Sequence, residues 1–127
     1  MTNFSDPLFQ ADRLSQTHCE ACRADAPPLS QRELEALPSQ LPRWTLIEDS
    51  DVAQLKQVFA FSNFVEALAF ANRVGELAEE EGHHPALLVE WGRVTARWWT
   101  HKIRGLHKND VIMAAKTDQL YADEPIS

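Results

Sequence analysis

Positive charge is scarce in this sequence. Lys and Arg number 12 against 19 Asp and Glu, which gives a net charge of -7 at pH 7. Proteins that bind nucleic acid or an anionic membrane surface neutralise phosphate groups with a basic stripe, so we expect neither partner here. A small uncharged ligand fits this balance better.

Long apolar runs are missing as well. No stretch approaches the roughly 18 residues that span a membrane, and residues 1–10 contain neither the basic region nor the apolar core of a secretory signal. The sequence also lacks internal repeats and a glycine-rich phosphate loop. We therefore expect a cytoplasmic protein without a membrane segment, and the two cysteines, Cys19 and Cys22, fit a reducing compartment.

Both cysteines lie in the segment HCEAC, residues 18–22. One Cys-x-x-Cys pair with one histidine supplies at most three zinc ligands, whereas a structural zinc site uses four. The surrounding residues, 1–28, are polar, show no periodicity and end in two prolines. We interpret them as an N-terminal tail, flexible or loosely docked, while a metal or redox role for the cysteines stays open.

Apolar residues, in contrast, are plentiful enough for one core. With 44% hydrophobic residues, four Trp and six Phe, the chain predicts a single domain that needs no disulfide. We place this domain at residues 29–123, and a short C-terminal tail, 124–127, follows it.

Capping and breaking residues set the predicted helices. A capping box at Ser30 starts a short helix that we expect Pro38 to stop. Ser62 caps a longer helix, in which apolar residues recur at helical spacing until Gly82 ends it. The last helix begins near His107.

Two β-hairpins are expected between these helices. Residues 44–48 and 53–61 are rich in β-branched and aromatic residues and flank a polar turn, and the stretch after Pro85 folds back near Gly92. The order helix, two strands, helix, two strands, helix predicts an α+β fold. We expect a four-stranded antiparallel sheet with helices packed on one face.

The stretch EEEGHHP, residues 79–85, combines carboxylates with adjacent histidines. The side chains of His83 and His84 diverge, and the helical spacings that aim two ligands at one metal ion are absent. A proton-transfer role fits better, because nearby carboxylates and a helix C-terminus raise the pKa of an imidazole. His101, at the end of a strand, is the candidate for a second acid–base group. A solvated loop at a helix end is the alternative without chemistry.

The spacing of these residues extends into a longer pattern. Glu79 and His83, with three residues between them, are followed directly by His84 and Pro85. Trp91 comes after five more residues, His101 after nine and Asp110 after eight. This pattern, with the element order over roughly residues 28–123, resembles the signature of the pterin-4a-carbinolamine dehydratases.

The resemblance implies a hydro-lyase. Such enzymes remove water across C4a and N5 of a 4a-hydroxytetrahydropterin and release the quinonoid dihydropterin. The reaction recycles tetrahydrobiopterin for aromatic amino-acid hydroxylases, and no metal or organic cofactor takes part.

The resemblance also assigns residues to the site. The catalytic set is His83, His84 and His101, in which His83 and His101 act as acid and base while His84 holds the substrate. Residues that line the pocket, partly through backbone groups, are Pro85, Thr100, Lys102 and Ile103.

Three further residues are expected to support the site. The resemblance makes Trp91 a wall of the pocket and gives Asp110 the task of orienting His101 or fixing the start of the last helix. The electrostatic argument makes Glu79 the residue that tunes His83.

Members of the family assemble as dimers or dimers of dimers, so a homodimer or homotetramer is implied. The bare edges of a four-stranded sheet give a physical motive for such pairing. Animal relatives bind a transcription factor, and a dimeric interaction protein that serves as a transcriptional dimerisation cofactor is therefore the alternative function. A metal hydrolase is a third reading, which a chelator would distinguish.

Overall fold

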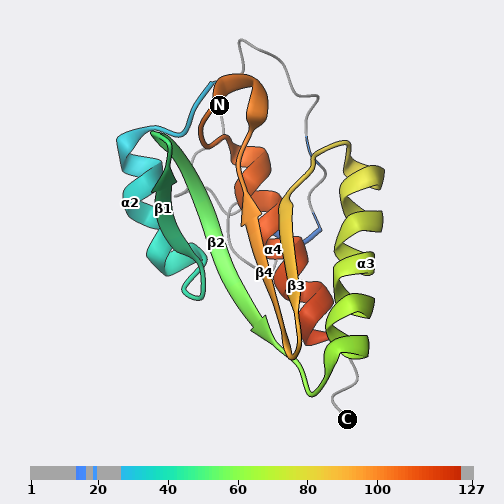
Figure 1. Cartoon of the computed structure of the whole chain (residues 1–127). Coiled ribbons are helices and arrows are strands. Elements are labelled where there is room, and N and C mark those ends of the chain that lie inside the picture. The colour runs from blue at the N-terminus through green and yellow to red at the C-terminus, as the bar shows by residue number, and fades with distance from the viewer. Residues whose placement is uncertain (1–13, 17–18, 20–26, 124–127) are drawn as a thin grey trace.

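The computed structural model describes residues 14–16, 19 and 27–123 (Figure 1). The elements follow one another as α2 (Gln31–Gln40), β1 (Thr45–Asp49), β2 (Val52–Ala60), α3 (Phe64–Glu81), β3 (Ala86–Glu90), β4 (Arg93–Trp98), the 3₁₀ turn η2 (His101–Ile103) and α4 (Lys108–Ala122). This order of helices and strands confirms the predicted α+β fold.

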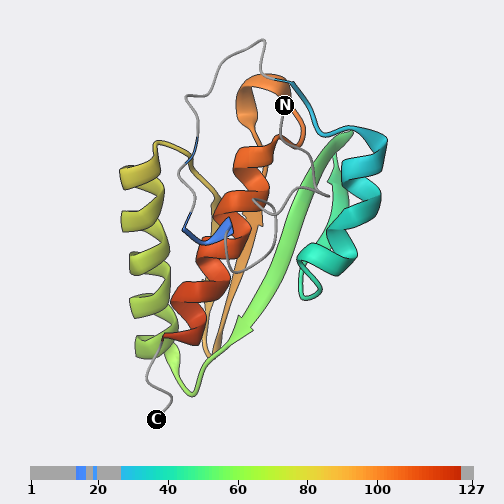
Figure 2. The ribbon, with the colours of Figure 1, turned by 180° about the vertical axis from the view of Figure 1, so that it is seen from behind.

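The four strands form one antiparallel sheet in the order β1-β2-β4-β3. The helices lie on one face of it, and Figure 2 shows α4 running across the middle of the sheet between α3 and α2. The opposite face of the sheet carries Val58 and Leu88, which are 51% and 56% exposed.

The core lies between the sheet and the helices. Val94, Ala96 and Trp98 alternate along β4, and all three side chains are fully buried. In α4 the nine consecutive residues 109–117 are buried, so this helix is covered on its outer side as well as on the side of the sheet.

The first helix differs from its prediction at one end. The capping box is present, since the hydroxyl of Ser30 accepts from the amide of Glu33 and the Glu33 carboxylate accepts from the amide of Ser30. The expectation that Pro38 stops the helix is wrong, because α2 continues to Gln40. Leu37 is buried, and its carbonyl accepts from the amide of Leu41, which keeps the last turn closed.

The long helix α3 begins one residue later than expected. Asn63, rather than Ser62, is the N-cap, and its side chain accepts from the amide of Glu66. The amide of Ser62 donates instead to the Glu66 carboxylate. Gly82 ends the helix as predicted, in the left-handed conformation with φ 66°.

The last helix, α4, begins where the sequence predicts. His107 is its N-cap, and Nδ1 of its ring accepts from the amide of Asn109. The Asp110 carboxylate accepts in return from the amide of His107, which completes a capping box. This start of α4 lies at the end of the sheet that also receives the end of α3 (Figure 1).

Candidate active site

Gly82 turns the chain so that the first histidine points inward. Its positive φ reverses the direction of the backbone after Glu81, and the amide of His83 then donates back to the carbonyl of Ala78 at 3.1 Å. The turn places His83 beneath the end of α3, where its side chain is 3% exposed.

The buried imidazole of His83 meets a buried carboxylate. Nε2 of His83 lies 2.6 Å from Oδ1 of Asp110, which is fully buried. The other oxygen, Oδ2, accepts from the hydroxyl of Thr100 at 2.8 Å and from the amide of His107 at 2.9 Å. A buried carboxylate needs several such donors to offset the loss of water. Asp110 therefore fixes the start of α4, as expected, but the histidine that it contacts is His83 rather than His101.

An aromatic ring sets the plane of the His83 imidazole. The ring of Trp98 stacks on it, with centroids 5.7 Å apart and planes 7° apart. Nε1 of Trp98 donates to the hydroxyl of Thr117 at 3.1 Å, which holds the indole against α4. His83 is therefore held both through its ring nitrogen and through its face.

His84 lies on the surface and pairs with Glu79. The side chains are 59% and 78% exposed, and Nε2 of His84 contacts Oε2 of the Glu79 carboxylate. Glu79 was expected to tune His83, and the structure corrects this prediction. The reversal of the chain at Gly82 puts His84 over Glu79 and turns His83 toward Asp110.

His101 also lies on the surface. Strand β4 ends at Trp98, so His101 is the first residue of η2 rather than the end of a strand. Its ring is 4.4 Å from that of Trp99, between centroids, and the planes are tilted by 35°. A bridge between Thr100 and Gly105 closes the loop that carries η2.

The four expected lining residues have different surroundings. Thr100 is 2% exposed, and its hydroxyl is used by Asp110. Lys102 is exposed, while Pro85 and Ile103 are half-buried. Figure 1 shows the segment after α3, which carries Pro85, and the segment after β4, which carries the other three, at the same end of the sheet.

Trp91 lies elsewhere in the chain. It stands in the turn between β3 and β4, is 74% exposed, and is followed by Gly92, whose carbonyl accepts from the amide of Phe61 before α3. This turn is at the end of the hairpin opposite to η2 (Figure 1). Within one chain, the expectation that Trp91 walls the histidine site is wrong, because the length of the hairpin separates them.

The stacking of Trp98 on His83 and the burial of the Glu81 side chain are two features that sequence reasoning missed. Trp98 could have been found from the alternation of β4, which puts it on the same side as Thr100 and therefore near the last helix. Glu81 gave no such signal, because nothing in the spacing of residues 79–81 separates a buried carboxylate from two exposed ones.

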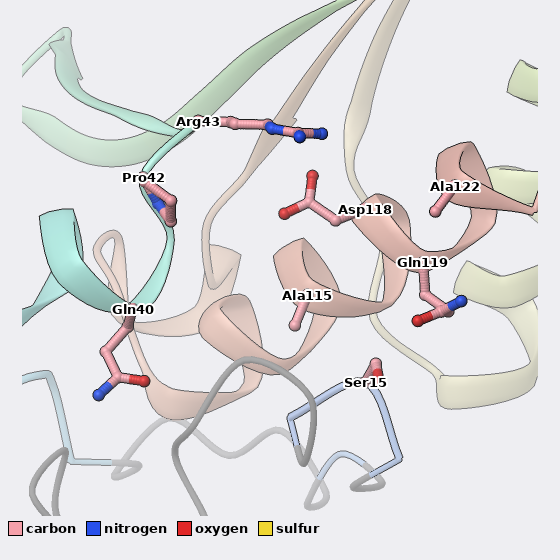
Figure 3. Close-up of a pocket in the computed structure, with 8 residues that line it drawn as sticks. All are labelled: Ser15, Gln40, Pro42, Arg43, Ala115, Asp118, Gln119 and Ala122. Carbon is pink, nitrogen blue, oxygen red and sulfur yellow. The ribbon is translucent and has the colours of Figure 1, made fainter.

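A cavity of about 360 Å³ opens at a distance from these histidines, between the end of α2 and the second half of α4. It is lined by Ser15, Gln40, Pro42, Arg43, Ala115, Asp118, Gln119 and Ala122. Figure 3 shows Arg43 and Asp118 facing each other across it. Burial raises the pKa of the Asp118 carboxyl, although hydrogen bonds from Gln57 and Trp44 and the charge of Arg43 oppose this effect.

Within the described ranges, no group of three or more His, Cys, Asp or Glu side chains is placed to hold a metal ion. His18 and Cys22, which the metal reading of HCEAC requires, lie outside the described residues. The described part of the chain likewise contains no helix both long and apolar enough to cross a membrane.

The fold and the site together define a small α+β protein with imidazoles and carboxylates gathered at one end of its sheet. A family model described as "Pterin 4 alpha carbinolamine dehydratase" matches residues 27–120. The chain belongs to this family, and the resemblance to the family is thereby confirmed.

Two curated relatives show how close the similarity is. A protein of Marinobacter nauticus is 59% identical over 108 residues, which cover 85% of this chain and 97% of the relative. A protein of Nitrosococcus oceani is 60% identical over 107 residues, which cover 84% of this chain and 95% of the relative. Both carry the name "Putative pterin-4-alpha-carbinolamine dehydratase".

Solved structures share the fold at lower identity. A transcriptional coactivator/pterin dehydratase from Brucella melitensis has a TM-score of 0.67 and 24% identity over 75% of this chain and 99% of its own. A pterin dehydratase-like protein identified as a RuBisCO assembly factor in the alpha-carboxysome has a TM-score of 0.53 and 22% identity, over 64% and 92% of the two chains. These two likenesses concern the fold alone.

Proposed function

We propose that this protein is a hydro-lyase that removes water from 4a-hydroxytetrahydropterin and so recycles tetrahydrobiopterin for aromatic amino-acid hydroxylases. The observation that carries the proposal is the buried pair of His83 and Asp110 in a chain of the pterin dehydratase family. A histidine fixed by a carboxylate is a group suited to proton transfer near neutral pH.

The dehydration needs one acid and one base. One imidazole, in its charged form, donates a proton to the C4a hydroxyl, and the C4a–O bond breaks as water leaves. A second, neutral imidazole takes the proton from N5, whose electron pair forms the C4a=N5 double bond. We assign these two tasks to His83 and His101 and assign binding of the pterin to His84, which is exposed and pairs with Glu79.

Access to His83 must change during the reaction. An acid or base acts only within hydrogen-bond reach of the proton it transfers, and the side chain of His83 is 3% exposed. The proposal therefore includes a local rearrangement when the pterin binds. Pro85, Thr100, Lys102 and Ile103 would then line the pterin, with Thr100 offering its backbone because its hydroxyl bonds to Asp110.

The test is the decay of the carbinolamine followed by stopped-flow absorbance. His101→Ala and His83→Gln, whose amide can still reach Asp110, are expected to slow the decay by about 100-fold or more. His107→Asn is the matched control, because it removes another described histidine yet keeps an N-cap acceptor. Circular dichroism checks the fold, and the rate should survive a chelator. Decay at the wild-type rate in both test variants would refute the assignment.

The protein would act as a homodimer or homotetramer in the cytoplasm. Strands β1 and β3 form the two edges of the sheet, and such edges invite pairing. The first turns of α3 expose three large apolar side chains, Phe64, Val65 and Leu68, at 44%, 75% and 43%. Exposed apolar groups of this kind favour an interface.

The same apolar surface is what favours the second candidate, a dimeric interaction protein that acts as a transcriptional dimerisation cofactor. Such a protein would keep its function without the histidines. A partner-binding activity that persists in the double variant of His83 and His101, with no dehydration in the wild type, would select this alternative.

A further inference from the structure

Residues 14–16, which precede the region matched by the family model, lie against the outer side of α4. Leu14 is fully buried in the core, and Figure 2 shows the segment that contains it lying across α4. Nζ of Lys116 donates to the carbonyl of Ser15 at 3.1 Å, so α4 also holds this segment by a hydrogen bond. These residues were expected to belong to a flexible or loosely docked tail.

Glu81, the last residue of α3, contacts Cys19. Its side chain is 5% exposed, and Oε1 accepts from the amide of Cys19 at 2.8 Å. Oε2 lies 4.0 Å from Nζ of Lys116, whose side chain is 10% exposed. A carboxylate with so little water around it needs hydrogen-bond and charge partners of this kind.

The contacts of Cys19 reach both halves of the buried histidine pair. Through its amide, Cys19 meets Glu81, two residues before His83. Through its sulfur it meets the carbonyl of Asn109, one residue before Asp110, at 3.9 Å. Cys19 therefore bridges the two backbones that carry His83 and Asp110.

We propose that Glu81 is a positioning residue for His83, acting through Cys19 and Lys116, and that Cys19 is part of the architecture of the site. The inference rests on the proposed dehydratase function. Small displacements of an acid or base cost large factors in rate, so loosening this bridge lowers the turnover even where the fold persists. Because Glu81 does not touch the pterin in this scheme, binding of the substrate should change little.

The experiment compares Glu81→Ala with Glu80→Ala in the full-length chain. Glu80 is the neighbouring carboxylate on the same helix and is exposed, so it is the matched control. Glu81→Ala is expected to lower kcat by about tenfold or more with KM nearly unchanged, and Glu81→Gln, which keeps an acceptor for the Cys19 amide, should recover part of kcat. Glu80→Ala should match the wild type.

A second readout does not depend on activity. The ring nitrogens of His83 in histidine-labelled protein should shift in the NMR spectrum of Glu81→Ala but not in that of Glu80→Ala. If Glu81→Ala only lowers the melting temperature, while kcat and the His83 signals equal those of Glu80→Ala, Glu81 is merely structural and the inference is wrong. Should Glu81→Ala not fold, the Glu81→Gln variant decides by the same two readouts. If the wild type does not dehydrate the carbinolamine, the proposed function fails, and the NMR comparison still decides whether Glu81 positions His83.

Discussion

Asp110 illustrates how one side chain serves two purposes. Its Oδ2 closes the capping box with the amide of His107, and its Oδ1 faces Nε2 of His83. The hydroxyl of Thr100 adds a third contact, which ties the segment after β4 to the same carboxylate. The sequence predicted that Asp110 orients His101 or fixes the start of the last helix, and the second of these roles is local. Which histidine contacts Asp110 depends on how the segment after α3 packs against α4. No local sequence pattern determines that packing.

At the residue scale, the buried carboxyl of Asp118 predicts how the stability of the protein changes with pH. Burial raises its pKa in the folded protein above the ordinary value, despite the hydrogen bonds from Gln57 and Trp44 and the charge of Arg43. Between the ordinary and the raised pKa the folded state holds a proton that the unfolded state has lost. The free energy of unfolding contributed by this group therefore falls as the pH rises through that window.

Urea unfolding of the wild type and of Asp118→Asn, from about pH 3 to about pH 7, measures this effect. The stability of the wild type relative to the variant should decline with rising pH. In an Arg43→Met background the decline should extend to higher pH, because a charge that lowers the pKa has been removed. A difference between wild type and Asp118→Asn that is constant over the whole range would contradict the expectation.

Within the element α3, two glycines have different effects on stability because one lies inside the helix and the other ends it. Gly82 ends the helix with φ 66°, whereas Gly75 lies inside it. A Cβ at Gly75 would meet nothing within 4 Å. Only the backbone conformation therefore distinguishes the two positions.

Gly82→Ala is expected to lower the free energy of unfolding by about 1 kcal/mol, because alanine is strained in the left-handed conformation. Gly75→Ala should raise it by about 0.5–1 kcal/mol, because alanine favours the helix interior. Denaturant unfolding of both variants measures the pair. Equal effects at the two positions would show that the left-handed turn before His83 is not maintained in solution.

The boundaries of elements were predicted less well than their existence. Pro38 predicts the end of the first helix and Ser62 the N-cap of the second. In the structure α2 ends two residues later, at Gln40, and the N-cap of α3 is the next residue, Asn63. In both cases a neighbouring residue, Leu41 or Asn63, makes the contact that closes the helix. Several residues near an end are chemically able to cap it, and packing selects among them.

The whole molecule is organised around α4. A helix buried along residues 109–117 cannot rest on the sheet alone, and α3 and the segment of Leu14 complete its cover. The division into an N-terminal tail, 1–28, a domain, 29–123, and a C-terminal tail, 124–127, stays a prediction. The packing of Leu14 indicates that part of the first segment belongs with the core.

The assembly gives a prediction at this scale. Val65→Glu puts a charge in the exposed apolar surface of α3 and should shift the protein toward monomer, because a charge in an apolar interface loses water without a partner. Val58→Glu is the control, since Val58 is 51% exposed on the open face of the sheet and should leave the assembly intact. Sedimentation velocity measures both. Dissociation by Val58→Glu alone would place the interface on the sheet instead.

The sequence by itself determined the order of helices and strands, the antiparallel sheet, the end of α3 at Gly82 and the start of α4 near His107. It also determined the family, through the spacing of its histidines and Asp110. These features depend on residues that are close in the chain or on a pattern that spacing alone defines.

Only the tertiary structure decided that His83 is buried on Asp110 while His84 faces Glu79, that Trp91 lies at the far end of the hairpin, and that Glu81 holds Cys19. Each of these outcomes depends on which distant segments meet around α4. These contacts between distant segments result from the packing of the whole core. Whether a side chain is buried depends on the complete folded structure and not on any single stretch of chain.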